Sequence, residues 1–319
     1  MNTYDIIDAF KKAMSEAGVT PPVETIIGDG QWHRYHIAGH KQGSQNGAYK
    51  LYLDGIPNGL FTDHKTSKDD KNPKISGKWK SGAGHKPFTQ ADRLQCDATK
   101  KRNEQQIAQS HERAAIKARH LLAIAKPITG NDHPYLQRKR VESHGLYRLG
   151  CWTKHRKNVA GQWEDINVRN VILVPLIDLY GTVWNVQAIF EEAHPRLEKR
   201  DKDFLRGGLT KGVFHAIGQA TNDEVLICEG YATGASLHEA TGFQVLCAMT
   251  ADNLLSVAQA VRAADPKKKI VLAADNDDTK PGNTGVTAAK KAARAVGGFL
   301  AIPPVSGDFN DYANQGGQL

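Results

Sequence analysis

The sequence predicts an α/β protein built from three folded parts. Residues 221–319 alternate strand-like apolar runs with helical runs, which predicts a parallel sheet flanked by helices. Residues 127–220 combine a buried strand pattern with a strand–turn–strand pattern, which predicts an α+β subdomain. Residues 1–90 consist of a short amphipathic helix followed by brief strand-like pieces between Gly, Asn, Asp and Pro turns, so a small β-rich module is expected. Residues 91–126 carry apolar positions at helical spacing and predict a basic helical linker.

Length, charge and cysteine use set the class of protein. A chain of 319 residues exceeds the usual size of one core, so several compact units are expected. It has no apolar run of about 18 residues and no signal-like start, which predicts a soluble cytoplasmic protein without a membrane partner. The four cysteines are widely separated, so we expect reduced thiols and no zinc site. A formal charge of +8 favours a polyanionic partner, although a basic protein without one remains the alternative.

The N-terminal module interleaves aromatic and basic residues along its strand-like pieces. Such mixing suits base stacking together with phosphate neutralisation on a single strand, and Trp32 and Arg34 are the candidate DNA-binding residues. The alternative is that the aromatic rings fill a small core. Three histidines, His33, His36 and His40, lack nearby ligands that would complete a metal site. The interleaved set is Trp32, His33, Arg34, Tyr35, Tyr49, Lys50, Tyr52, Phe61, Lys65, Trp79 and Lys80.

The middle of the chain offers basic surfaces and one clear hairpin. The linker carries many lysines and arginines that either face phosphate or form a solvated helix face. The run VRNVILVPLID predicts a buried strand, and the following DLYGTVWNVQAIF predicts a turn at Gly181 and a return strand.

Carboxylates stand at the ends of the strands in the C-terminal part. Glu229 closes the first strand, Asp275 and Asp277 close the third, and Asp308 and Asp311 follow the fourth. Because ligands bind at the carboxyl ends of parallel strands, these groups are expected to gather at one edge. Several negative charges there would repel one another without a counterion, so a divalent cation is expected.

The D-N-D triplet suits a magnesium site. In an extended segment Asp275 and Asp277 point to the same side, while Asn276 points away. Mg²⁺ prefers hard oxygen ligands, and a pair of such ions would stabilise both oxygens of an in-line phosphoryl displacement. Taken singly, each acidic residue is more often a helix cap or a turn residue, and Asp308 and Asp311 have that alternative open.

These motifs resemble the TOPRIM domain of DnaG-type DNA primases. The segments are EGYATG from Glu229, ADND ending at Asp277, and DFNDY from Asp308, and EGYATG is the form typical of primases from conjugative plasmids and satellite phages. The resemblance covers roughly residues 130–319. It implies primer synthesis from ribonucleotides on single-stranded DNA with two Mg²⁺ or Mn²⁺ ions. It also implies that Glu229, Asp275 and Asp277 are catalytic and that these three and Asp308 hold the metals.

The resemblance also nominates residues for nucleotide and DNA binding. VRNVILVPLI is similar to a basic segment of the primase core and nominates Arg169, and KDFLRGG and KGVFHAIG nominate Lys202 and Lys211. Solvated surface residues are the alternative for all three. Gly230 would allow a sharp turn beside phosphate, and Thr233 would cap the following helix and leave its amides for an anion.

The sequence departs from the family plan at its start. DnaG-type primases begin with a cysteine-ligated zinc ribbon, whereas the DGIPNG turn at 54–59 resembles the N-terminal region of some plasmid primases. The sequence has no P-loop motif, so a replicative helicase is considered only as a separate partner. Two rival functions remain open: another TOPRIM enzyme such as a nuclease or topoisomerase, and a non-catalytic protein that binds single-stranded DNA during replication or transfer.

Overall fold

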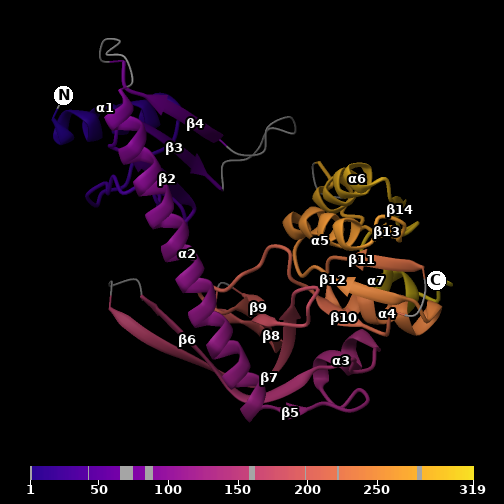
Figure 1. Cartoon of the computed structure of the whole chain (residues 1–319). Coiled ribbons are helices and arrows are strands. Elements are labelled where there is room, and N and C mark those ends of the chain that lie inside the picture. The colour runs from indigo at the N-terminus through magenta and orange to yellow at the C-terminus, as the bar shows by residue number, and fades with distance from the viewer. Residues whose placement is uncertain are drawn as a thin grey trace. The chain divides into compact units, whose positions relative to one another are not determined.

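The chain divides into two compact units, each of which is described separately. The computed structural model describes residues 2–41, 43–64, 75–82, 89–157, 162–197, 199–220, 223–278 and 282–319. The first unit comprises residues 1–108 with 157–164, and the second comprises 109–156 with 165–319 (Figure 1). No helix among the residues so described is long and apolar enough to cross a membrane.

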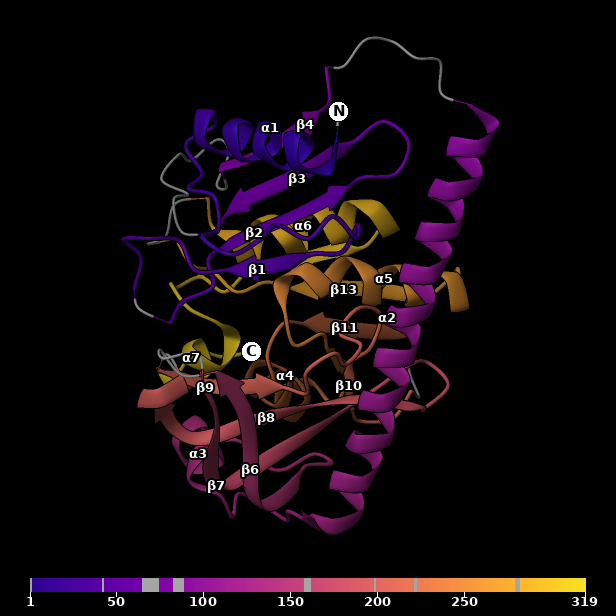
Figure 2. The same cartoon turned by 90° about the vertical axis from the view of Figure 1, so that its left-hand side faces the viewer.

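The first unit contains a four-stranded antiparallel sheet with one helix packed on it. Helix α1 is capped at its start by the side chain of Asn2 and buries Ile6, Phe10 and Met14. Phe10 meets three rings of the sheet edge-on, those of Tyr49, Phe61 and Trp79. Figure 2 shows α1 lying beside the sheet. The elements are α1 Thr3–Glu16, β1 His33–Tyr35, β2 Gly47–Tyr52, β3 Asn58–Asp63 and β4 Ile75–Lys80, in the sheet order β1-β2-β3-β4.

One long helix, α2 Gln90–Ile124, supplies residues to both units. In the first unit its polar side chains bind two loops of the β-rich module: Thr99 donates to the carboxylate of Asp54, and Asn103 donates to the Gly30 carbonyl. In the second unit its small residues Ala114 and Ala118 are buried against a sheet. The predicted helical linker is therefore one continuous helix.

The second unit begins with a five-stranded antiparallel sheet. The predicted turn is present: Gly181 has a φ of +80° between β7 and β8, and Asp178 accepts hydrogen bonds from the Tyr180 and Thr182 amides. One face of this sheet packs on the end of α2 and the other faces the C-terminal part of the chain. Its elements are β5 Lys126–Pro127, α3 Pro134–Lys139, β6 Tyr147–Lys157, β7 Trp163–Ile177, β8 Val183–His194, the 3₁₀ helix η1 Pro195–Leu197 and β9 Arg200–Phe204, and the sheet order is β5-β6-β7-β8-β9.

The C-terminal part is a five-stranded sheet with the order β10-β12-β11-β13-β14. The last four strands in that order are parallel, as the alternation of apolar runs predicted. β10 was not anticipated: it is the edge strand of the sheet and runs antiparallel to β12. The elements are β10 His215–Ile217, β11 Glu224–Cys228, α4 Tyr231–Thr241, β12 Gln244–Cys247, α5 Ala251–Ala264, β13 Lys269–Ala273, α6 Thr284–Val296, β14 Phe299–Ala301 and α7 Phe309–Asn314.

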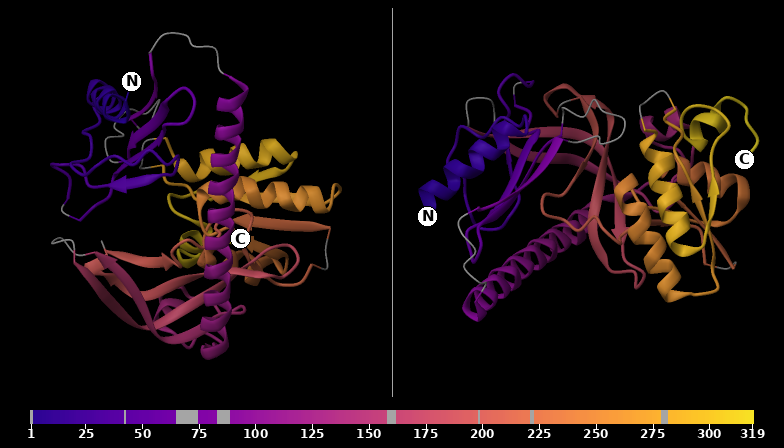
Figure 3. Two further views of the ribbon diagram at one scale, coloured as in Figure 1. Left: turned by 60° about the vertical axis from the view of Figure 1, so that its left-hand side comes forward. Right: turned by 90° about the horizontal axis from the view of Figure 1, so that it is seen from above.

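Helices cover both faces of this sheet. Alternate residues of each buried strand point to opposite faces, so Ile227 and Leu272 pack under α5 and α6, whereas Cys228 and Ala273 pack under α4. Figure 3 shows α5 and α6 side by side on their face. The fold class is thus the predicted α/β arrangement, with the parallel sheet last, an α+β subdomain before it and a β-rich module first.

Candidate active site

The connections that follow the neighbouring strands β11 and β13 run to opposite faces of the sheet. After β11 the chain turns to α4 on one face of the sheet, and after the neighbouring β13 it turns to α6 on the other face. Such a reversal leaves a gap beyond the carboxyl ends of the two strands, where ligands bind in open α/β sheets. Glu229 follows β11 and Asp275 follows β13, so this topology brings the two predicted carboxylates to the same gap.

Asp275 is the most perturbed carboxyl group of the gap. Burial raises its pKa to about 7, and the negative charges of Glu229, Asp308 and Asp277 add to that rise. Its Oδ1 is buried and has no hydrogen-bond partner in the structure. A buried carboxylate oxygen without a donor is costly, so this atom could accept a ligand that the fold does not supply.

Glu229 shares this environment. Burial raises its pKa, Asp277 raises it further, and the positive charge of Lys202 opposes both effects. The backbone amide of Ala251, at the start of α5, hydrogen-bonds the carboxylate and also lowers the pKa. This contact from a helix terminus was not anticipated, because a backbone amide carries no sequence signal.

Asn276 fixes the loop that carries Asp308. Its backbone pairs with Gly307 through two hydrogen bonds, and its side-chain amide donates to the carbonyls of Pro303 and Val305 at 3.3 and 3.2 Å. Its side-chain oxygen accepts from Asn283 at 2.8 Å. The prediction that Asn276 points away from the carboxylates thus agrees with its contacts. The sequence analysis did not predict that Asn276 holds the loop before Asp308 in place.

Asp308 has two functions in this arrangement. It is the N-cap of α7: its side chain accepts from the Asp311 amide at 2.9 Å, and Asp311 completes a reciprocal capping box. The helix-cap alternative is therefore correct for both residues. The charge of Asp308 nevertheless raises the pKa of Asp275, so its carboxylate also lies in the electrostatic reach of the gap.

The residues of the gap fit a divalent cation held together with substrate. Across the described residues, no three His, Cys, Asp or Glu side chains converge closely enough to enclose a metal by themselves. Mg²⁺ is typically bound by one or two carboxylates, waters and substrate phosphates, so a closed protein cage is not required. The partnerless Oδ1 of Asp275 and the mutual repulsion of the carboxylates match such an open site.

The three predicted basic residues lie in different places. Lys202 on β9 lowers the pKa of both Glu229 and Asp275, so its charge acts on these carboxylates. Lys211 is exposed in the loop before β10, next to Gly212, whose amide donates to Asn253 on α5. Arg169 is exposed on β7, and no contact with the carboxylates is seen for it among the described residues.

The start of α4 differs from expectation. Thr233 does not cap this helix: the N-cap is Gly230, and no side chain caps it. Thr233 lies inside the first turn, where its hydroxyl oxygen is buried and has no hydrogen-bond partner. A Cβ on Gly230 would meet only that oxygen, at 3.7 Å, so nothing within the chain requires glycine there.

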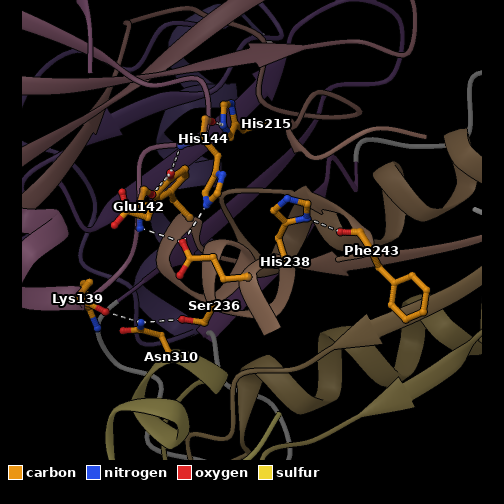
Figure 4. Close-up of polar contacts among 10 residues, drawn as sticks. Lys139, Glu142, His144, His215, Ser236, His238, Phe243 and Asn310 are labelled. Carbon is orange, nitrogen blue, oxygen red and sulfur yellow. Dashed lines mark hydrogen bonds and ion pairs between the residues drawn. The ribbon is translucent and has the colours of Figure 1, made fainter. Parts of the chain in front are cut away.

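Polar contacts join α3 and the loop after it to the C-terminal helices (Figure 4). Glu239 on α4 accepts hydrogen bonds from His144 and from the Glu142 amide. The buried side chain of Asn310 on α7 donates to the Lys139 carbonyl and to Ser236. These side chains hold α4 and α7, and with them Asp308, against the subdomain. They were missed because their partners are far apart in the sequence.

The β-rich module uses most of its aromatic rings internally. Tyr35, Tyr49 and Phe61 are buried, so the core alternative is correct for them. Trp32 is 54% exposed and Arg34 is exposed, as DNA-binding candidates should be. Lys65 lies outside the described residues. The three histidines bind separate partners: His33 bonds Asp29, His36 bonds the Ser44 carbonyl, and His40 approaches Asp63.

Comparison with known proteins assigns the class of the C-terminal part. Residues 224–318 match the family model described as "Toprim domain". This range runs from β11 to beyond α7 and includes all four carboxylates of the gap. The C-terminal sheet is therefore a Toprim domain, and the predicted resemblance to TOPRIM-containing DnaG-type primases is confirmed.

Particular relatives extend this match over nearly the whole chain. The chain is 30% identical to a "DNA primase TraC" of Escherichia coli over 97% of its length, and equally to a second protein of that name over 96%. It spans 27% and 20% of those two relatives, so it corresponds to a minor part of each. Among solved structures it is similar to a DnaG primase catalytic domain bound to single-stranded DNA, with 12% identity, a TM-score of 0.46, and coverage of 66% of this chain and 77% of that chain.

Proposed function

We propose that this chain is a DNA primase that synthesises short RNA primers on single-stranded DNA with divalent metal ions, Mg²⁺ or Mn²⁺. One observation carries the proposal. The charges of Glu229, Asp277 and Asp308 all raise the pKa of Asp275 at the strand ends of a Toprim domain, and the charge of Lys202 lowers it. The similarity to the TraC primases over nearly the whole chain supports the same reaction class.

In this proposal the carboxylates are the metal ligands and Lys202 is the counter-charge. Asp275, Asp277, Glu229 and Asp308 would hold the cations, which supply electrostatic stabilisation of the attacking and leaving oxygens when bound. Lys202 lowers the pKa of Glu229 and Asp275 and so keeps more of each in the charged form that binds a cation. It would also offset charge on a ribonucleoside triphosphate.

The remaining predicted residues have auxiliary functions in the proposal. Lys211 and Arg169 would contact the triphosphate or the template, and Gly230 would allow a phosphate to approach the uncapped start of α4. Trp32 and Arg34 would contact the template strand. A replicative helicase remains a candidate partner.

The deciding experiment is a primer-synthesis assay on defined single-stranded templates with ribonucleotides and Mg²⁺ or Mn²⁺. Labelled oligoribonucleotides are expected from the natural protein and not from Asp275→Asn, which keeps the size of the side chain and removes its charge. Asp97→Asn on the exposed face of α2 is the matched control and should keep full activity. Shortened or relaxed DNA would point to a different Toprim reaction, and DNA binding without any product would favour a non-catalytic protein.

A further inference from the structure

The sheet of the β-rich module segregates its side chains sharply between two faces. One face packs on α1: a Cβ on Gly59 would strike Phe10, and a Cβ on Gly77 would strike Phe61. These glycines therefore point to the same side as the core aromatics. Because successive strand residues alternate between faces, the intervening residues of each strand point to the other side.

That other face, here called the open face, is basic. In the register of the sheet Lys50 is opposite Leu60, and Leu60 is opposite Lys78, so these three residues form one row across the strands. The next row joins Tyr52 to Asn58 and Asn58 to Lys80. On β1, Arg34 lies opposite Ala48. The open face thus carries the cations Arg34, Lys50, Lys78 and Lys80.

The structure pairs none of these cations with an acidic group among the residues that it describes. Within the described residues no carboxylate pairs with any of them, and the strand positions of the open face hold no Asp or Glu. The nearby Asp63 belongs to the opposite side, where His40 lies at 3.5 Å. The cations therefore raise the positive potential of one face of the sheet, and no carboxylate of the described residues offsets their charge there.

Aromatic groups accompany the cations. The Lys50 ammonium lies 5.0 Å from the centre of the Tyr52 ring, so a cation and a ring are held together on this face. Trp32 directly precedes β1, two residues before Arg34, and more than half of its side chain is exposed. A charged sheet face beside the exposed ring of Trp32 suits a single strand, since cations can meet its phosphates and unpaired bases can stack on the ring.

We propose that the open face binds single-stranded nucleic acid through its phosphodiester backbone, without divalent metal and without base specificity. The inference rests on the proposed function, because it assigns the template strand to this surface. It also extends that function, since binding here is independent of the Toprim carboxylates. The central contacts are those of Lys50 and Lys78, with Arg34 and Lys80 beside them.

The test measures binding of a labelled mixed-sequence single-stranded DNA to the full chain in EDTA, at several salt concentrations. Lys50→Ala/Lys78→Ala should weaken binding on the order of tenfold at moderate salt and lower the slope of log K against log[salt] by about 1.4, since each lost contact to a single strand removes about 0.7. The matched control is Lys11→Ala/Lys12→Ala on α1, which removes the same charge from the side opposite the open face.

The outcomes separate this inference from the primase proposal. If both double variants bind like the natural protein, or lose affinity equally, the open face is not the binding surface. Circular dichroism and thermal melting of each variant test whether misfolding causes a loss of DNA affinity. Asp275→Asn should bind DNA normally in EDTA. Normal DNA binding by the natural protein, together with no primer synthesis by it, would overturn the proposed reaction and leave this inference standing. Tighter binding to duplex than to single strands would overturn the assignment to a single strand.

Discussion

Asn276 and Gly307 form an isolated two-residue bridge that joins the D-N-D segment to the loop before Asp308. The Asn276 amide donates to the Gly307 carbonyl at 2.8 Å, and the Gly307 amide donates back at 2.9 Å. The uncharged Asn276 thereby fixes the D-N-D segment relative to Asp308, although the two are far apart in the sequence. The side chain of Asn276, between the two aspartates that we propose as metal ligands, thus has a structural function.

Replacing Asn276 should damage both stability and activity. Asn276→Ala removes the side-chain bonds to Pro303, Val305 and Asn283 and leaves part-buried carbonyls unpaired, at a cost of about 1–3 kcal/mol in the free energy of unfolding. The Asp308 loop should lose its fixed position, so primer synthesis should fall by more than the stability loss explains. Chemical denaturation and the primer assay measure the two effects.

Asn314→Ala is the control for that prediction. The Asn314 amide also donates to a backbone carbonyl, that of Lys139, but from the last residue of α7, at the end opposite the N-cap Asp308. A similar loss of stability with nearly normal primer synthesis is expected. Equal loss of activity in both variants would mean that Asn276 acts only through general stability.

The raised pKa of Asp275 predicts how stability depends on pH. The pKa is about 7 in the folded protein against an ordinary value of 3.8, so the folded state binds the proton more tightly than the unfolded chain does. Stability should therefore fall as the pH rises from about 4 through about 7 in metal-free buffer, because the folded state must bury a charge. In Asp275→Asn this fall should be smaller, which melting curves across that range will show.

A divalent cation should reverse the loss of stability at high pH. Mg²⁺ binds the ionised carboxylates of the folded protein, so it should raise the melting temperature at pH about 8 more than at pH about 5. Asp275→Asn should lose most of this rise, and Asp97→Asn should keep it. An equal response of all three proteins to Mg²⁺ would remove the support for a cation at Asp275.

Lys202 should control the pH profile of the reaction. Its charge lowers the pKa of Glu229 and Asp275, so Lys202→Met should raise both pKa values and move the pH optimum of primer synthesis upward, with a fall in kcat of at least about tenfold. Lys199→Met changes an exposed lysine on the turn before β9 and should leave the profile unchanged. A lower kcat without a shifted profile would show that Lys202 acts on substrate alone.

The convergence of the carboxylates was predictable because parallel strands deliver their carboxyl ends to one edge of a sheet. Glu229 and Asp275 needed only that rule. The hydrogen bonds of Asn276 to the loop before Asp308, and that of the Ala251 amide to Glu229, were not predictable. They depend on which loops and helix starts lie close together in the folded chain. The aromatic residues of the β-rich module could not be assigned to a core or to a DNA-binding surface from the sequence. Tyr35 and Tyr49 could have stacked on bases, but they lie on the face that packs on α1. Only the sheet register decides which face a strand residue occupies.

Replacing two glycines near the gap by alanine should have opposite effects on the stability of the protein. A Cβ on Gly285, in the first turn of α6, would lie 2.4 Å from the Asp275 carbonyl oxygen, so Gly285→Ala must move the helix start or the carboxylate segment. We expect a loss of stability of about 1–3 kcal/mol and a strong loss of primer synthesis. A Cβ on Gly230 meets only the Thr233 hydroxyl at ordinary contact distance, so Gly230→Ala should fold normally.

Gly230→Ala therefore tests whether a nucleotide phosphate contacts the start of α4. If a phosphate approaches the start of α4 closely, the added methyl group should raise KM for ribonucleotides while the melting temperature stays near that of the natural protein. Melting curves and steady-state kinetics of the two glycine variants distinguish the cases, because Gly285→Ala lowers both stability and kcat. Unchanged kinetics in a folded Gly230→Ala protein would show that the nucleotide does not contact this turn.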